Sequence, residues 1–177
     1  FEKLQEQSSS RAEFDQVYDQ VVSLGEVLST IIIENFLSST GLSTQWIDAR
    51  EYILTDASFR EGKVQWDTTQ TRIDRLQQTL QKSIVVTQGF IGSTPEGLTT
   101  TLGREGSDYT AAIFASCLQA SDVTIWKDVP GVMSADPKRL PGAVVFSELP
   151  YKEAAEMTYY GASVIHPKTI KPLQKRI

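Results

Sequence analysis

The chain has 177 residues, 40% hydrophobic and 22% charged, which is ordinary for a globular protein and long enough for one domain with a core. Its net charge of −5, without a cluster of lysines and arginines, argues against a nucleic-acid partner. The single cysteine, Cys117, excludes an intramolecular disulfide and suits the reducing cytoplasm. Apolar neighbours indicate that Cys117 is a core thiol. No run looks long or apolar enough to span a membrane, so we expect no membrane partner.

The first quarter of the chain predicts one long helix. Residues 10–13 (Ser-Arg-Ala-Glu) fit a capping box at its start, and the small polar residues around Gly41 predict its end near residues 38–41. Gly25, a costly residue inside a helix, indicates close approach of another group beside Glu26. Apolar residues recur at three- and four-residue spacing, which predicts one buried face: Phe14, Val17, Val21, Leu24, Leu28 and Ile31.

Further along, short strands alternate with helices. Strands are predicted at residues 44–48, at 84–87, which is a buried β-branched run, and at 123–126. Helices are predicted at residues 71–81, 111–118 and 151–160; Gly161 stops the last of these, and Pro167 begins one further helix. Residues 55–69 are expected to be irregular. This alternation implies parallel pairing, and ligands in such sheets bind beyond the carboxyl ends of the strands. Glycine-containing loops follow Thr87 and Trp126 at two such ends.

Residues 99–113 are the most informative segment. Gly103 and Gly106 would let the backbone approach a ligand, and the following helix start offers free N–H groups to an anion. Arg104 can hold a carboxylate or phosphate with two parallel hydrogen bonds, and the pair Ser107 and Asp108 follows it. Together these parts predict a site for a small, multiply negative substrate, as in a kinase of small molecules.

Each of these residues also has a plainer interpretation when it is taken alone. Arg104 is compatible with a surface arginine in a tight turn, Glu26 with a solvated helix face, and Asp128 with a turn before Pro130. The only histidine, His166, is interpreted as a structural residue at a helix start. One histidine and one cysteine argue against a zinc site, and neither a Gly-x4-Gly-Lys-Ser/Thr phosphate loop nor the protein-kinase motifs occur.

Four segments, in this order and spacing, resemble aspartate kinase of the amino-acid kinase superfamily: residues 86–92, 99–108, 126–131 and 162–167. The block Leu-Gly-Arg-x-Gly-Ser-Asp-Tyr at residues 102–109 is highly specific, and the resemblance runs from about Ser23 to the C-terminus. It implies an α/β fold, a three-layer αβα sandwich with a mainly parallel central sheet, incomplete at both ends. Residues 1–177 would then be a partial catalytic domain, without the first strand and its Lys-Phe-Gly-Gly motif, the last kinase strand and the regulatory domains.

The resemblance implies ATP-dependent phosphorylation of the side-chain carboxylate of L-aspartate to 4-phospho-L-aspartate. This reaction is the first step toward lysine, threonine, methionine and diaminopimelate, in a protein that is monofunctional or fused to homoserine dehydrogenase. ATP and L-aspartate would be the partners, with Mg²⁺ held mainly through the phosphates, in a cytoplasmic homo-oligomer. Because the lysine motif is missing, we expect this span alone to be inactive. The alternative to an aspartate kinase is a non-catalytic kinase-fold module that binds an amino acid or a nucleotide.

The same resemblance implies roles for individual residues. Glu26 would hold the substrate ammonium and Arg104 one carboxylate, while Phe90 would line the aspartate pocket with its backbone. Ser107 and Asp108 would complete the pocket, and Asp108 would also orient charged groups around the transferring phosphoryl group, so that Arg104 and Asp108 are the catalytic candidates. The nucleotide is expected at Lys127, Asp128, Met133, Asp136 and Lys138. No side chain is expected to bind a metal directly. The chain departs from the family pattern at Glu105, Lys127, Met133 and Ser163.

Overall fold

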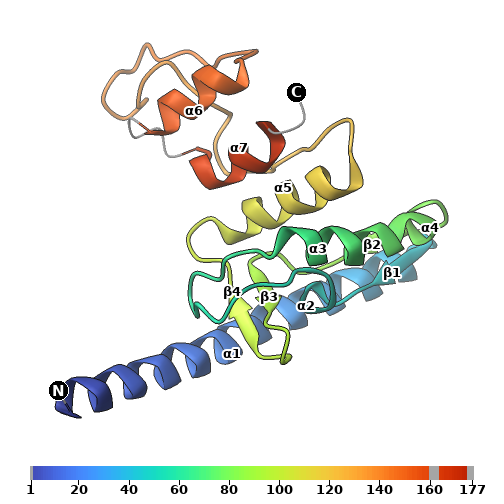
Figure 1. Ribbon diagram of the computed structural model, residues 1–177. Coiled ribbons are helices and arrows are strands. Elements are labelled where there is room, and N and C mark those ends of the chain that lie inside the picture. The colour runs from blue at the N-terminus through green and yellow to red at the C-terminus, as the bar shows by residue number, and fades with distance from the viewer. Residues whose placement is uncertain (1, 160–163, 175–177) are drawn as a thin grey trace.

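The computed structural model describes residues 2–159 and 164–174. Helix α1 (Glu2–Ser39) runs along one side of the molecule, and α5 (Gly106–Leu118), α7 (Pro167–Gln174) and α6 (Tyr151–Tyr159) are stacked on the other (Figure 1). The strands and the short helices lie between them: α2 (Ala49–Tyr52), α3 (Trp66–Ile73), the 3-10 helix η1 (Asp74–Leu76) and α4 (Gln77–Leu80).

Two pairs of short strands lie in the middle layer. Strand β1 (Thr44–Trp46) pairs in parallel with β2 (Ile84–Val86), as the alternation of strands and helices predicts. Strands β3 (Ile91–Ser93) and β4 (Thr99–Thr101) form an antiparallel hairpin, which the sequence did not predict. An isolated parallel bridge joins Leu54 to Ser93. The α/β class with parallel pairing is therefore confirmed.

Two strand predictions need correction. The run at residues 84–87 forms β2, but it is not fully buried, because Ile84 keeps 51% of its surface exposed. The strand expected at residues 123–126 is wrong: this stretch pairs with no described strand, and Trp126 is 91% exposed. A β-branched run forms a strand only where a neighbouring strand accepts its backbone hydrogen bonds.

The hydrophobic core lies between α3, the end of the hairpin and the buried side of α5. It consists of six buried residues: Ile53, Ile73, Leu102, Tyr109, Ile113 and Cys117. Cys117 is 3% exposed, which confirms that it is a core thiol. This core holds α5, and therefore the loop before it, in a fixed position under the site.

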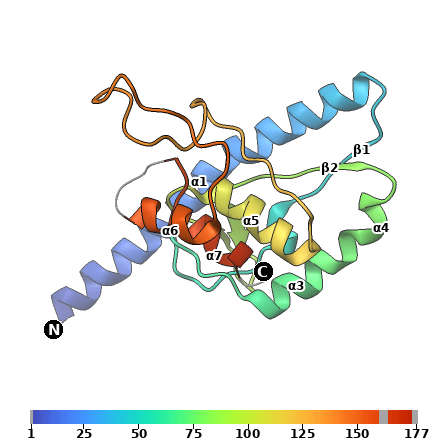
Figure 2. The ribbon, with the colours of Figure 1, turned by 90° about the horizontal axis from the view of Figure 1, so that it is seen from above.

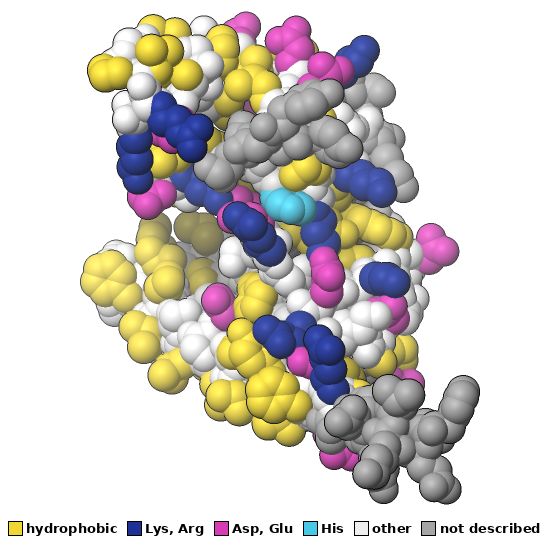
Figure 3. Space-filling view, turned by 90° about the vertical axis from the view of Figure 1, so that its left-hand side faces the viewer, with side chains coloured by type: hydrophobic (Ala, Val, Ile, Leu, Met, Phe, Trp, Pro, Cys, Tyr) yellow, Lys and Arg dark blue, Asp and Glu magenta, His cyan; other side chains and the backbone are white. Residues whose placement is uncertain are grey.

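Helix α1 turns its polar side toward the protein. Asp19, Ser23 and Thr30 are buried, whereas the face predicted to be buried is exposed to solvent, so that prediction is wrong. Figure 3 shows hydrophobic side chains gathered along the lower part of the molecule. Besides Tyr18, which lines the cavity described below, the exposed large apolar residues of α1 are Phe14, Val17, Val21, Leu24, Leu28, Ile31, Ile32, Ile33 and Phe36, which we call the apolar face of α1.

Side-chain hydrogen bonds attach this polar side to the middle layer. The amide Nε2 of buried Gln88 and the indole Nε1 of Trp46 both donate to Thr30 Oγ1, at 2.9 and 3.0 Å. Gln88 Oε1 accepts the backbone N–H of Ala49 at 2.7 Å, and Glu34 Oε1 accepts the hydroxyl of Thr44 at 2.7 Å. Buried polar groups are tolerated only when they are paired in this way. Gln88 therefore fixes the start of the loop that follows β2.

Several details of α1 differ from the prediction. It already includes residues 2–9, so the expected start at residues 10–13 is wrong, although its end at Ser39 is confirmed. No atom lies within 4 Å of a Cβ built on Gly25, so this glycine does not mark a close approach. Residues Arg11–Ser39 are long and apolar enough, by length and composition alone, to cross a membrane, contrary to our expectation. The polar side of this segment packs against β1 and β4, so in this structure the segment is part of the fold.

The remaining helices agree with the sequence in type more than in length. Helix α3 begins at Trp66, five residues before the predicted helix at 71–81, and α5 begins at Gly106 instead of 111. Pro167 opens α7, and His166 Nδ1 accepts the N–H of Lys168 at 3.2 Å, which confirms a structural role at this helix start. Gly161 and Ser163 lie outside the described residues.

Candidate active site

A cavity of about 640 Å³ opens at the N-terminal end of α5. This volume falls within the range of about 300–1,000 Å³ that is typical of small-molecule sites. Its walls come from α1, the loop between α2 and α3, the loop after β2, and the segment between β4 and α5. The lining residues are Tyr18, Glu26, Arg60, Phe90, Thr101, Gly103, Arg104, Glu105, Gly106, Ser107, Asp108 and Lys127.

Two loops pack tightly against each other at the floor of the site. A Cβ on Gly106 would lie 2.6 Å from Phe90 Cδ2, and a Cβ on Gly89 would lie 2.9 Å from Ser107 Cα. Gly103 has φ of +74°, and its Cβ position lies 3.1 Å from the carbonyl oxygen of Arg60. On the side where a Cβ would lie, Gly103 and Gly106 therefore pack against the protein itself, and both glycines also line the cavity.

Two charged side chains that line the cavity, those of Glu26 and Arg104, have no partner among the described residues. Glu26 is half-buried on α1, and Arg104 is exposed in the loop before α5. Neither side chain forms a hydrogen bond or an ion pair with any residue that the structure describes. A carboxylate and a guanidinium that face one cavity in this way can bind an ammonium and a carboxylate of the same small molecule.

Lys127 connects the site to the segment that follows α5. Its Nζ lies 2.6 Å from Asp108 Oδ2 and 3.0 Å from Glu105 Oε2. Hydrogen bonds to Asp108, and secondarily to Glu105, raise the pKa of Lys127, so that the ammonium stays charged at neutral pH. Lys127, expected on the nucleotide side, thus lies in the same cavity as the residues expected to bind aspartate.

Phe90 has a left-handed backbone, with φ of +71°. Its N–H donates to Thr110 Oγ1 at 3.0 Å, and its carbonyl accepts the N–H of Leu102 at 2.8 Å. The N–H is therefore already used, and only the ring and the second lone pair of the carbonyl remain for a ligand. Ser107, in the first turn of α5, keeps its side chain exposed beside them.

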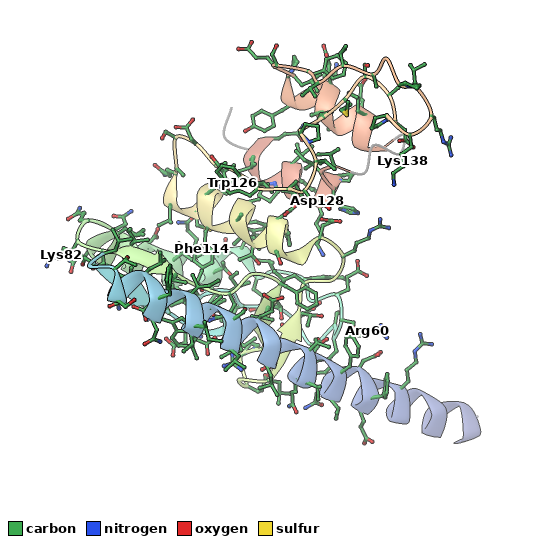
Figure 4. All side chains as sticks on the ribbon, turned by 180° about the vertical axis from the view of Figure 1, so that it is seen from behind. Arg60, Lys82, Phe114, Trp126, Asp128 and Lys138 are labelled. Atoms are coloured by element: carbon green, nitrogen blue, oxygen red, sulfur yellow. The ribbon has the colours of Figure 1, made fainter. Side chains whose placement is uncertain are left out.

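The other expected nucleotide residues are not brought into the cavity. Asp128, Met133, Asp136 and Lys138 lie on the 121–150 segment, which extends away from the helical stack in Figure 2. Met133 forms an isolated bridge with Val145, and Asp136 Oδ1 accepts the N–H of Lys138 at 2.9 Å. Figure 4 shows Arg60 beside α1, and Lys138 on the opposite side of the molecule beyond Asp128.

Sequence reasoning missed four residues of the cavity wall and its support: Tyr18, Asp19, Arg60 and Thr101. Tyr18 and Asp19 precede Glu26 by eight and seven residues, a spacing that places them on one helix face and that could have found them. Arg60 lies in an irregular loop where no pattern points to it. Thr101 ends a strand that the sequence did not predict.

The described residues include no group of three or more histidine, cysteine, aspartate or glutamate side chains that could hold a metal ion. Of the two carboxylates that pair with Lys127, Asp108 is less exposed than Glu105.

Comparison with known proteins agrees with this geometry. A profile of the amino acid kinase family matches residues 2–177. The chain belongs to the amino acid kinase family. It is 43% identical over 157 residues to lysine-sensitive aspartokinase 3 of Escherichia coli K12, covering 87% of this chain and 34% of that protein. It is 39% identical over 158 residues to the chloroplastic bifunctional aspartokinase/homoserine dehydrogenase 2 of Arabidopsis thaliana, covering 89% of this chain and 17% of that protein.

Solved structures of this family show the same fold. The E. coli aspartokinase III complex with aspartate and ADP matches with a TM-score of 0.87 and 40% identity, over 91% of this chain and 36% of that one. The aspartate kinase of Clostridium acetobutylicum matches with a TM-score of 0.75 and 30% identity, over 89% of this chain and 34% of that one. The chain therefore spans about a third of the length of these two structures and of aspartokinase 3.

Proposed function

We propose that this chain is part of an aspartate kinase that transfers the γ-phosphoryl group of ATP to the side-chain carboxylate of L-aspartate. One observation carries the proposal: the side chains of Glu26 and Arg104, which have no partner among the described residues, line the same cavity beside the Asp108–Lys127 ion pair. Relatives that are named aspartokinases, and a similar structure that holds aspartate and ADP, support this choice of substrates.

The substrate is held by charge complementarity. Glu26 pairs with the ammonium of aspartate, and the guanidinium of Arg104 donates two parallel N–H hydrogen bonds to one carboxylate. Phe90 contributes its ring and carbonyl, and the hydroxyl of Ser107 lies at the first turn of α5. Because an amino acid that lacks the matching group forgoes a charge-assisted hydrogen bond, Glu26 and Arg104 each discriminate against it.

Phosphoryl transfer between two anions depends on positioning and on positive charge. The ionised carboxylate of aspartate attacks the γ-phosphorus, the bond to the leaving ADP oxygen breaks, and no proton has to be removed. The positive charge comes from the unpaired guanidinium of Arg104 and from the N-terminal N–H groups of α5, while Asp108 and Glu105 hold Lys127 beside them. Mg²⁺, when bound through the phosphates, supplies further neutralisation of charge.

The product, 4-phospho-L-aspartate, is an activated acyl phosphate that opens the route to lysine, threonine, methionine and diaminopimelate. For the nucleotide, we propose binding along the 121–150 segment through Asp128, Met133, Asp136 and Lys138, next to Lys127. The complete protein is proposed to be a homo-oligomer of the cytoplasm.

The test is Mg-ATP-dependent formation of aspartyl hydroxamate, measured on the chain at its full natural length and on the 177-residue span. Hydroxamate that requires both ATP and aspartate, and that does not form from L-asparagine, is the expected result for the longer protein. Binding of aspartate or nucleotide without any turnover in the longer protein would contradict the proposal and favour a non-catalytic binding module.

A further inference from the structure

Arg60 is a third cation of the cavity, and neither the sequence nor the proposed function above gives it a role. It lies in the loop between α2 and α3 and lines the cavity together with Glu26 and Arg104. Lys127 is already neutralised by Asp108 and Glu105. Arg60 and Arg104 are therefore the two guanidinium groups of this cavity that a ligand can use.

The backbone of Arg60 adopts a conformation that arginine rarely takes. Its φ is +66°, in the left-handed region. Four described residues other than glycine have positive φ: Arg60, Phe90, Glu105 and Gln119. The first three line this cavity, while Gln119 ends α5 in the usual left-handed cap. Backbone strain of this kind concentrates at functional sites, where the surrounding structure holds it in place.

A buried carboxylate holds Arg60 in this conformation. Asp19 is fully buried on α1, and its Oδ2 accepts the backbone N–H groups of Arg60 and Thr101, each at 2.8 Å. Its Oδ1 accepts the hydroxyl of Thr101 at 2.9 Å. The Gly62 N–H also donates to the carbonyl of Thr101, at 2.8 Å. The loop that carries Arg60 is therefore tied to both α1 and β4.

The side chain of Arg60 is positioned but only loosely paired. Its guanidinium lies over the ring of Tyr18, 4.5 Å from the ring centre, and Tyr18 lines the cavity as well. Its Nη1 lies 3.3 Å from Asp15 Oδ1, longer than the distance of about 2.7–2.9 Å that is usual for a charge-assisted hydrogen bond. The side chain is 50% exposed, so solvent screens this ion pair. An incoming carboxylate can replace Asp15 at little cost.

We propose that Arg60 is a second carboxylate-binding residue of the cavity, which exchanges Asp15 for a carboxylate of the amino-acid substrate. This inference rests on the proposed function and deepens it. Glu26 takes the ammonium, and Arg104 and Arg60 take one carboxylate each, so the cavity selects an amino acid with two carboxylates over one with a single carboxylate. Arg60 is thus a specificity-determining residue.

The experiment measures equilibrium binding of L-aspartate and of L-asparagine, which lacks the second carboxylate, to the chain at its full natural length. Arg60→Gln is expected to weaken aspartate binding about ten-fold and to leave asparagine binding unchanged. Arg60→Gly should do the same, because glycine adopts the left-handed backbone without strain and removes the guanidinium together with the rest of the side chain. Asp15→Asn should tighten aspartate binding a few-fold, since it removes the competing partner.

Arg75→Gln, which alters an exposed arginine outside both the cavity and the 121–150 segment, is the matched control and should leave the binding of aspartate and asparagine unchanged. Equal loss of aspartate and asparagine binding, or an effect on the KM for ATP alone, would overturn the proposal, the latter because it would assign Arg60 to the phosphates. Unchanged aspartate binding in both Arg60 variants would overturn it while leaving the proposed function intact. Failure of the unaltered protein to bind or phosphorylate aspartate would overturn both.

Discussion

Arg104 makes no ion pair with a described residue, so its guanidinium is free to bind substrate. In the chain at its full natural length, Arg104→Ala should raise the KM for aspartate and lower kcat, with little change in the KM for ATP. A hydrogen bond to a charged group contributes about 1.5–3 kcal/mol, which corresponds to a loss of about 10- to 150-fold in kcat/KM.

Arg104→Lys separates charge from geometry in this prediction. Lysine keeps the positive charge but loses the two parallel N–H donors, so we expect an intermediate effect on aspartate. Steady-state kinetics with each substrate varied in turn distinguishes the variants. Aspartate kinetics that are unaltered in Arg104→Ala would return this residue to the role of a surface arginine.

A second prediction concerns the contribution of Asp48 to the free energy of unfolding. It caps α2 through the N–H of Arg50 at 3.0 Å and accepts the Nε of the same arginine at 2.9 Å. Burial alone would raise the pKa of Asp48, but the hydrogen bonds from Arg50 outweigh it and hold the pKa below the ordinary value of 3.8. The folded state therefore favours the ionised carboxylate. This stabilisation is complete above the unfolded pKa and is lost as the pH falls through the lower folded pKa.

We expect Asp48→Asn to be less stable than the unaltered 177-residue chain at pH 7, and the difference to shrink below about pH 4. Asp48→Ala should lose about 1 kcal/mol more at every pH, because it also loses the helix cap. Urea unfolding at pH 7 and pH 3 measures both effects. A difference between Asn and Asp that is independent of pH would show that the charge of Asp48 contributes nothing.

At the scale of elements, the packing of α5 against the loop after β2 depends on the absence of a side chain at Gly106. An added Cβ would lie 2.6 Å from Phe90 Cδ2, so Gly106→Ala must displace the Phe90 ring. We expect a loss of about 1–3 kcal/mol in the free energy of unfolding, as for other overpacked positions, with weaker aspartate binding in the full-length protein.

Gly25→Ala is the matched control on α1, where no atom lies within 4 Å of the new Cβ. Alanine is the better helix former by about 1 kcal/mol, so this variant should be more stable than the unaltered chain. Thermal unfolding followed by circular dichroism compares the two substitutions. Equal effects at the two positions would mean that packing against Phe90 does not decide the outcome.

The occurrence of the helices, the parallel β1–β2 pair and the glycine-containing loops were predictable, because they depend on local pattern and turn chemistry; the starts of α1, α3 and α5 were not. The β3–β4 hairpin was not, because its buried strand Thr99–Thr101 carries no hydrophobic alternation. Its hydroxyls are satisfied by distant partners, such as Thr55 with Thr100 at 2.7 Å and Asp19 with Thr101 at 2.9 Å. Such long-range pairing leaves no trace in a sequence window.

The candidate site was predictable in part for the same reason. The resemblance named Glu26, Phe90, Arg104, Ser107 and Asp108, all of which line one cavity. Arg60 escaped notice because its place depends on Asp19, which lies 41 residues earlier in the chain. The periodicity of α1 correctly indicated an amphipathic helix, but periodicity does not say which of the two faces meets the rest of this chain.

For the whole molecule, the apolar face of α1 determines behaviour in solution. Contiguous apolar surface of this extent drives association in water. We expect the 177-residue chain, prepared alone, to self-associate and to bind a hydrophobic dye. The double variant Leu24→Gln and Leu28→Gln should reduce both effects without lowering the unfolding temperature, because each leucine is more than 60% exposed.

Sedimentation velocity over a range of protein concentrations measures this association. A matched variant with Ser38→Gln and Ser39→Gln, at exposed polar positions of the same helix, should leave it unchanged. A chain that stays monomeric at high concentration and binds no dye would show that this face is hydrated without penalty.

The orientation of α1 also sets which substitutions this chain tolerates. In a scan of single substitutions for folding of the 177-residue span, the usual order should be reversed along this helix. Leucine, valine and phenylalanine positions on the apolar face should accept almost any residue, whereas Asp19 and Thr30, which hold the hairpin, Arg60, Trp46 and Gln88, should accept few. Here the polar residues carry the information that specifies the fold.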